Sequence, residues 1–241
     1  MRIRTHLLLL TALLMLPSWA FSQNGDGADS ETPAAGRTIE ELYLSQDMEL
    51  QIMRSQAQAN DREMKELALR SIRDMVENEQ TSDGVYVILE SLAAEGVGRQ
   101  VRSNGSIVNN FPDIRRQAAE LLGQVGGEQA KDTLVGILRD DPETMVLAEA
   151  AYALGQIGLN ENNEVSDHMV QTLLRENSRS TPDNNLAFSL ILSLERLSAQ
   201  NGGLADPEVL NVLLETASGP YIRTVRRRAI EAIVNMREHG G

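Results

Sequence analysis

The sequence predicts an all-α solenoid, in which pairs of helices stack one after another. One phrase occurs twice, over 114–126 and again over 146–158, so that its two copies are offset by 32 residues. Over 64–76 and 85–93, apolar residues recur at the period of amphipathic helices. A fixed repeat of this length is typical of a supersecondary unit that buries its apolar face only against its neighbours.

Aligning the repeated phrase along the chain predicts five A helices, which alternate with B helices over 83–95, 128–139, 164–178 and 206–217. The A helices share one slot that is mostly small and a second, apolar slot seven residues later. A small residue at the first slot lets neighbouring helices approach closely. The first slot holds Ala68, Ala118, Ala150, Leu190 and Ala229, and the second holds Met75, Val125, Ile157, Leu197 and Met236.

Capping residues and prolines predict where the helices begin. Thr38 with Glu41 forms a capping box for a first helix over 38–58, and Asn60 with Glu63 begins the next helix in a similar way. Proline is tolerated in a first turn because the N–H that it lacks has no helical partner there. Five prolines are therefore predicted to mark helix starts, namely Pro112, Pro142, Pro182, Pro207 and Pro220.

Residues 1–22 are predicted to be a signal peptide. Arg2 and Arg4 precede an apolar run over 7–16, and Ala20 and Ser22 are small residues at the positions that a signal peptidase reads. An uncleaved N-terminal anchor is the alternative, although the run is short for a membrane span. The chain has no cysteine, which excludes a lipoprotein. We expect Sec-type export to the periplasm or beyond, without membrane insertion of the mature chain.

Residues 23–37 are rich in small and acidic residues and are predicted to form a disordered acidic linker before a repeat domain over 38–241. The net charge of −13 argues against a nucleic-acid partner. His168 has no second histidine or cysteine with metal-ligand spacing, and no nucleophile elbow or phosphate-binding loop occurs. The sequence therefore predicts no metal, no cofactor and no catalytic residues.

The segment over 138–158 resembles HEAT repeats, and among them the short type that is also found in phycobilisome lyases. Its Asp-Asp-Pro at 140–142 and Ala-Ala-Tyr-Ala-Leu-Gly-Gln-Ile-Gly at 150–158 are similar to the pattern of that family. The similarity is good over 111–158, fair over 219–238 and weak elsewhere. It implies a right-handed α-α superhelix of about four to five antiparallel helix pairs, whose concave side is usually lined by B helices and often grips a partner.

The resemblance also implies a charge contact between repeats, made by a basic residue early in the A helix. Arg115 and Arg226 match this slot, and Lys65 occupies it in the first repeat. Leu147 and Ala187 depart from the pattern, so the contact is not expected in the middle of the array.

An insertion over 96–111 lengthens the interval between the first two A helices. Asn104-Gly105 favours a tight turn, and the flanking Val101 and Ile107 favour a short hairpin. Because insertions in repeat arrays project from one face and often bind, Arg99, Arg102 and Asn104 are candidate partner-binding residues. The alternative is a tolerated surface loop without a role.

A dense cationic run lies on the last A helix. Arg223, Arg226 and Arg227 are predicted to share one face and are candidates for binding a carboxylate or phosphate group of a partner. The alternative is structural, because Arg226 occupies the inter-repeat slot and the others could pair with acids such as Glu231.

Stacked repeats present an extended curved surface, which is suited to binding another protein. The sequence therefore predicts a non-catalytic interaction scaffold of the periplasm or cell envelope, either free or as a subunit of an envelope assembly. The alternative is a lyase- or chaperone-like factor that acts through a polar concave groove, as the resemblance implies.

Overall fold

A computed structural model describes residues 39–204 and 206–239, with side chains for 47–204 and 206–237. The predicted signal peptide, the linker and the capping box of Thr38 and Glu41 lie outside the described side chains. The described residues form α1 (Ile39–Gln58), α2 (Arg62–Glu77), α3 (Asp83–Ala93), β1 (Arg102–Ser103), β2 (Ser106–Ile107), α4 (Pro112–Val125), α5 (Gly127–Asp140), α6 (Thr144–Ile157), the 3₁₀ turn η1 (Glu161–Asn163), α7 (Glu164–Asn177), α8 (Asn184–Gln200), α9 (Pro207–Ser218) and α10 (Arg223–His239).

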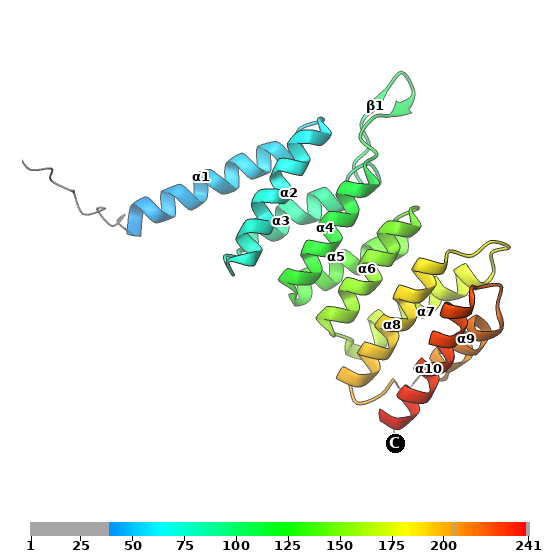
Figure 1. The fold of residues 1–241 in the computed structure, drawn as a ribbon. Helices are drawn as coiled ribbons and strands as arrows, with labels where there is room; N and C mark the ends of the chain where they lie inside the picture. Colours follow the sequence, from blue (N-terminus) through cyan, green and yellow to red (C-terminus); the bar gives the residue numbers. More distant parts are fainter. Residues whose placement is uncertain (1–38, 205, 240–241) are drawn as a thin grey trace, which may run out of the picture. The chain divides into compact units, whose positions relative to one another are not determined.

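The helices form five consecutive pairs, α1–α2, α3–α4, α5–α6, α7–α8 and α9–α10, which stack in chain order. Figure 1 shows the resulting two rows, with the even-numbered helices in front and the odd-numbered helices behind them. Each helix packs on its pair partner and on the neighbours in its own row. The all-α superhelix predicted from the sequence is confirmed.

The even-numbered row lies on the inner face of the curve. Neighbouring helices in this row pack much more closely than those of the odd-numbered row, and a double-layered stack bends toward its more closely spaced layer. This corrects the expectation that the B helices line the concave side, because α2, α4, α6, α8 and α10 are the predicted A helices. Two glycines make the close approach possible: Gly123 faces Ala153, and Gly155 faces Ser193.

One apolar core runs through all five pairs of the described residues. The small slot is fully buried at every A helix, from Ala68 to Ala229. The second slot varies more, since Leu197 and Met236 are buried whereas Met75, Val125 and Ile157 are partly buried. The first slot therefore contributes to the core in every A helix, whereas the second slot does so less uniformly.

Several helix starts differ from those predicted. Pro112 and Pro207 do occupy first turns, but α6, α8 and α10 begin after Pro142, Pro182 and Pro220. At α8 the cap is Asp183, whose carboxylate accepts from the amides of Asn185 and Leu186. At α2 the cap is Asp61 rather than Asn60. None of the described helices has the length and apolar character required to span a membrane.

The glycine at 155 tests whether close packing of the inner row limits stability. A methyl group there would approach the Cα of Ser193 to 2.8 Å, and we expect Gly155→Ala to lower the free energy of unfolding by about 1–3 kcal/mol. Gly136, in α5, has open space around it, so Gly136→Ala should stabilise by up to about 1 kcal/mol. Urea unfolding of both variants measures the difference, and equal effects would contradict the close packing.

Candidate functional site

The insertion between α3 and α4 is anchored by a buried ion pair. The Lys65 ammonium lies 3.0 Å from Glu95, and both side chains are almost completely buried. The Asn109 amide nitrogen donates to Glu95 Oε1 and to the Arg99 carbonyl, each at 2.7 Å, and its oxygen accepts from the Val101 amide at 2.7 Å. Asn109 therefore ties both legs of the insertion to a charge pair in the core.

Arg115 extends this network toward α5. Its side chain is fully buried, and its Nε and one terminal nitrogen donate to the two Asp141 oxygens at 2.6 and 3.2 Å. Its other terminal nitrogen donates to the Glu95 carbonyl at 3.0 Å and to Asn110 Oδ1 at 2.8 Å. One guanidinium thus joins α4, the turn before α6 and the base of the insertion.

The insertion ends in a two-stranded hairpin that projects from the stack (Figure 1). Arg102 pairs with Ile107 and Ser103 pairs with Ser106 in antiparallel register. Asn104 and Gly105 form the turn with positive φ angles of 50° and 84°, which is the geometry of a type I′ hairpin turn.

The three candidate residues of the insertion occupy different parts of it. Arg99 lies at the base, where its carbonyl accepts from Asn109, and Asn104 is exposed at the tip. The Arg102 guanidinium is also exposed and hydrogen-bonds Gln100 and the Gly105 carbonyl. Their role in partner binding stays a prediction.

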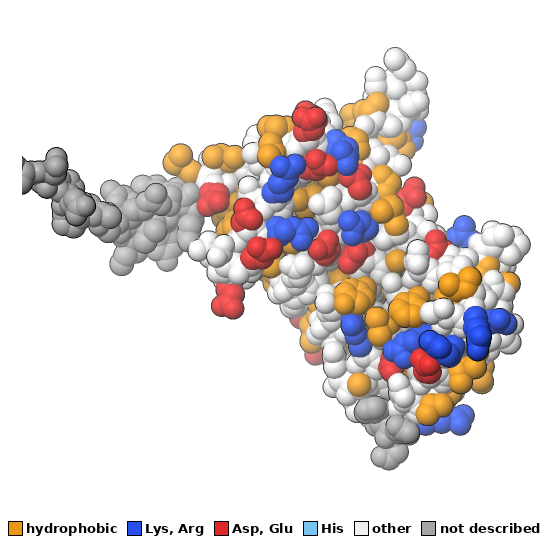
Figure 2. Space-filling model, in the orientation of Figure 1, with side chains coloured by type: hydrophobic (Ala, Val, Ile, Leu, Met, Phe, Trp, Pro, Cys, Tyr) orange, Lys and Arg blue, Asp and Glu red, His pale blue; other side chains and the backbone are white. Residues whose placement is uncertain are grey.

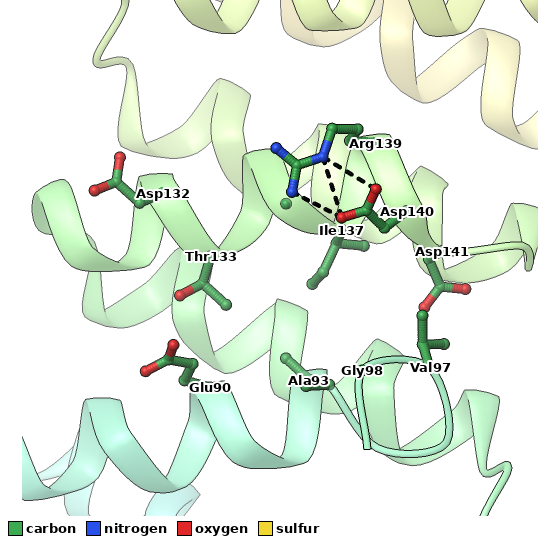
Figure 3. Close-up of a pocket in the computed structure, with 12 residues that line it drawn as sticks. Glu90, Ala93, Val97, Gly98, Asp132, Thr133, Ile137, Arg139, Asp140 and Asp141 are labelled. Carbon is green, nitrogen blue, oxygen red and sulfur yellow. Dashed lines mark hydrogen bonds and ion pairs between the residues drawn. The ribbon is translucent and has the colours of Figure 1, made fainter. Parts of the chain in front are cut away.

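A pocket of about 420 Å³ opens at the foot of the insertion. Figure 3 shows α3 and α5 on opposite sides of it, with the segment that carries Val97 and Gly98 at one end. Ala93, Val97 and Ile137 provide apolar walls, whereas Glu90 and Asp132 add carboxylates. The pocket has the size and mixed polarity of a site for a ligand or a partner side chain.

Of the remaining charged side chains of this pocket, Asp141 is bound by Arg115, and Arg139 and Asp140 pair with each other. Arg139 hydrogen-bonds Asp140 through two nitrogens at 2.8–3.1 Å. That contact lowers the pKa of the Asp140 carboxyl, which keeps it ionised near neutral pH. Among the described residues, no cluster of histidines and carboxylates has the arrangement of a metal site.

The inner face carries a ladder of polar contacts from one even-numbered helix to the next. Figure 2, viewed from the side of this row, shows acidic and basic side chains interspersed over it. In the middle of the ladder, the Arg196 guanidinium stacks 4.6 Å from the centre of the Tyr152 ring. The ion pairs that cross between helices are Arg62–Asp113 at 2.7 Å, Arg73–Glu120 at 3.0 Å, Arg116–Glu149 at 3.2 Å and Glu195–Arg228.

The arginines of α10 do not act as one cluster. Arg227 lies 3.3 Å from Glu231. Arg223 and Arg226 are exposed and make no side-chain hydrogen bond or ion pair within the described part of the chain. The three arginines that were expected to act together on one face thus differ: Arg227 is paired, whereas Arg223 and Arg226 have no counter-charge among the described residues.

Comparison with known proteins identifies the repeats. The family model for HEAT repeats matches residues 106–195. The middle of the chain is a HEAT-repeat array. The matched residues run from β2 to α8 and include the repeated phrase of the sequence, so the family resemblance found there is confirmed. No curated protein matches the sequence.

Among solved structures, the complex of CpcE and CpcF of phycocyanin lyase from Nostoc sp. PCC7120 is similar to this chain. The likeness covers 88% of this chain and 71% of the other, with a TM-score of 0.56 and 15% sequence identity. It contradicts the prediction of a non-catalytic protein, because a solenoid of this kind occurs in a lyase. That prediction was based on missing motifs, and such solenoids do not carry the motifs of the common enzyme folds.

The residues that anchor the insertion were not found from the sequence. Glu95 and Asn109 are separated by other residues that look equally polar, so their partnership is visible only after folding. One signal did exist: Lys65 and Lys131 are the only lysines of the chain, and both are buried and paired with carboxylates. Because the other cations of the chain are mostly arginines, the two lysines could have been predicted to occupy special, buried positions.

The Lys65–Glu95 pair can be tested by removing one charge. Glu95→Gln leaves a buried ammonium without a counter-charge, and we expect a loss of about 3–5 kcal/mol in the free energy of unfolding. Glu90→Gln changes an exposed carboxylate near the end of α3, five residues before Glu95, and should change stability by less than about 0.5 kcal/mol. Denaturant unfolding of both proteins checks this, and equal stability would mean that the pair does not anchor the insertion.

Proposed function

We propose that this HEAT-repeat protein binds a partner protein in a lyase- or chaperone-like role, with the hairpin and the polar inner face as its contact surfaces. The observation that carries the proposal is the buried network beneath the hairpin. A tolerated surface loop requires no buried charge, whereas this insertion is fixed by Glu95, Asn109 and Arg115. A rigid base positions an exposed tip, which is the arrangement of a recognition element on a stable scaffold.

The surroundings of the hairpin fit a protein partner. Val108 is 45% exposed beside the strands, and the pocket at the foot of the insertion combines apolar walls with carboxylates. Together they would accept a segment with aliphatic and basic side chains. On the inner face, Tyr152 and Arg196 belong to the residue types that are enriched in protein interfaces.

The similarity to a phycocyanin lyase complex supports the lyase- or chaperone-like role over a passive scaffold. A solenoid that handles another protein needs a surface that holds it, and the polar inner face and the hairpin are the two surfaces that this chain offers. We assign no catalytic residues, since the support comes from the fold alone.

A hairpin variant tests this function. Arg102→Glu combined with Val108→Ser changes the exposed tip but keeps Asn109 and the buried base. In affinity capture from an extract of the native cell, we expect the partner recovered by the wild type to be reduced at least about tenfold. Arg179→Glu is the matched control, because it changes an exposed arginine elsewhere and should leave recovery unchanged. Equal recovery by all three proteins would refute a contact through the hairpin.

We also propose that the chain is exported, on the basis of the signal-like residues 1–22. Mass spectrometry of the protein from a periplasmic fraction should give a mature chain that begins at Gln23. Leu10→Arg interrupts the apolar run and should leave the precursor uncleaved. A wild-type protein that keeps residue 1 and stays in the cytosol would contradict export.

A further inference from the structure

The two ends of the stack expose most of its accessible apolar side chains. Eight of the eleven exposed large apolar residues in the described part lie on the first or the last helix pair. They are Met48, Ile52, Met64 and Leu67 at one end, and Leu214, Ile222, Ile230 and Val234 at the other.

At the C-terminal end these residues form a stripe with one charge in it. Arg226, Ile230 and Val234 are spaced by four residues, which places them on one face of α10, and Ile222 lies four residues before Arg226, just ahead of the helix. The position of Ile230 is filled by Leu69, Ala119, Ala151 and Ile191 in the preceding even-numbered helices, and all four are buried. Ile230 itself is 54% exposed. The stripe is therefore the face with which each inner helix packs on the next one, but on α10 no helix among the described residues covers it.

In the two other even-numbered helices that carry a cation at the position of Arg226, this cation pairs with a carboxylate. Lys65 occupies the position of Arg226 in α2 and pairs with Glu95 of the following helix pair. Arg115 occupies it in α4 and pairs with Asp141, also in the following pair. Arg226 makes no such contact among the described residues. A neighbour that continued the stack would have to supply a carboxylate to it.

The N-terminal end offers a carboxylate in the matching turn. Asp61, between α1 and α2, accepts from the Glu63 amide at 3.0 Å. Asp141, between α5 and α6, accepts the same bond from the Glu143 amide at 2.9 Å, and both of its oxygens also accept from Arg115. Asp61 forms no ion pair in the described part of the chain. Met64 follows it and is 38% exposed, whereas the equivalent Ile114 is fully buried.

We propose that copies of this chain associate head to tail, with α9–α10 of one copy packed on α1–α2 of the next and Arg226 paired with Asp61 of that next copy. The contact would repeat the interface that already joins pairs within the chain. A twofold contact between two C-terminal ends is disfavoured, because Arg223 and Arg226 would face the same cations. A head-to-tail contact leaves one end open in every copy and so builds open chains.

Charge exchange provides the test. We expect sedimentation velocity of the wild type to show species that grow with concentration, and Arg226→Asp and Asp61→Arg each to weaken this association at least about tenfold. Mixing the two variants should restore association, since Asp at 226 then meets Arg at 61. Asp61→Asn keeps the helix cap and should weaken association without loss of stability. Arg179→Asp changes an exposed arginine outside both end helix pairs; it is the control for net charge and should associate like the wild type.

Circular dichroism of each variant separates folding from assembly, because a variant that fails to fold cannot be rescued by mixing. A wild type that stays monomeric at all concentrations would overturn the proposal. So would association that is unaffected by either charge reversal, or variants that remain apart when mixed. The outcome is independent of partner capture by the hairpin, since none of these substitutions changes the insertion.

Discussion

The close approach of the even-numbered helices determines the rest of the structure. Alanine at 118 and 150, with glycine at 123 and 155, lets one row of helices pack more tightly than the other. The unequal spacing bends the stack and brings charged side chains of successive helices within reach of each other. Every even-numbered helix has the same packing surface toward the next one. The last helix, α10, therefore also has this surface, although no further helix follows it in the described chain.

Buried charges add alignment to this packing. A buried ion pair contributes little net stability compared with apolar side chains, but an arrangement that leaves one of its charges unpaired is strongly penalised. Two such pairs, Lys65–Glu95 and Arg115–Asp141, therefore fix the alignment of the first three helix pairs relative to each other. Because Glu95 and Asn109 also hold the insertion, its position is coupled to the register of the stack. Farther along, Leu147 and Ala187 replace the cation, and those pairs are connected by apolar packing together with contacts such as Arg196–Tyr152 and Glu195–Arg228.

Periodic features were predictable from the sequence, and contacts between distant residues were not. The B helices lie within two residues of their predicted limits because apolar spacing follows directly from helix geometry. The starts at Pro142 and Pro182 were misplaced because Asp141 is engaged by Arg115 and Asp183 takes over the capping of α8. The inner row was misassigned because curvature depends on the relative size of two packing surfaces. The anchor of the insertion joins residues whose spacing follows no motif.

The burial of both lysines makes the native surface nearly inert toward amine chemistry. Lys65 is enclosed beside Glu95, and hydrogen bonds to Glu164 and Asp132 raise the pKa of Lys131, so its ammonium is held protonated and is a poor nucleophile. Acylating reagents, aldehyde fixatives and isopeptide-forming enzymes would find no accessible ε-amine in the folded repeats. Cross-links that map the neighbours of this protein must therefore form through carboxylates or arginines.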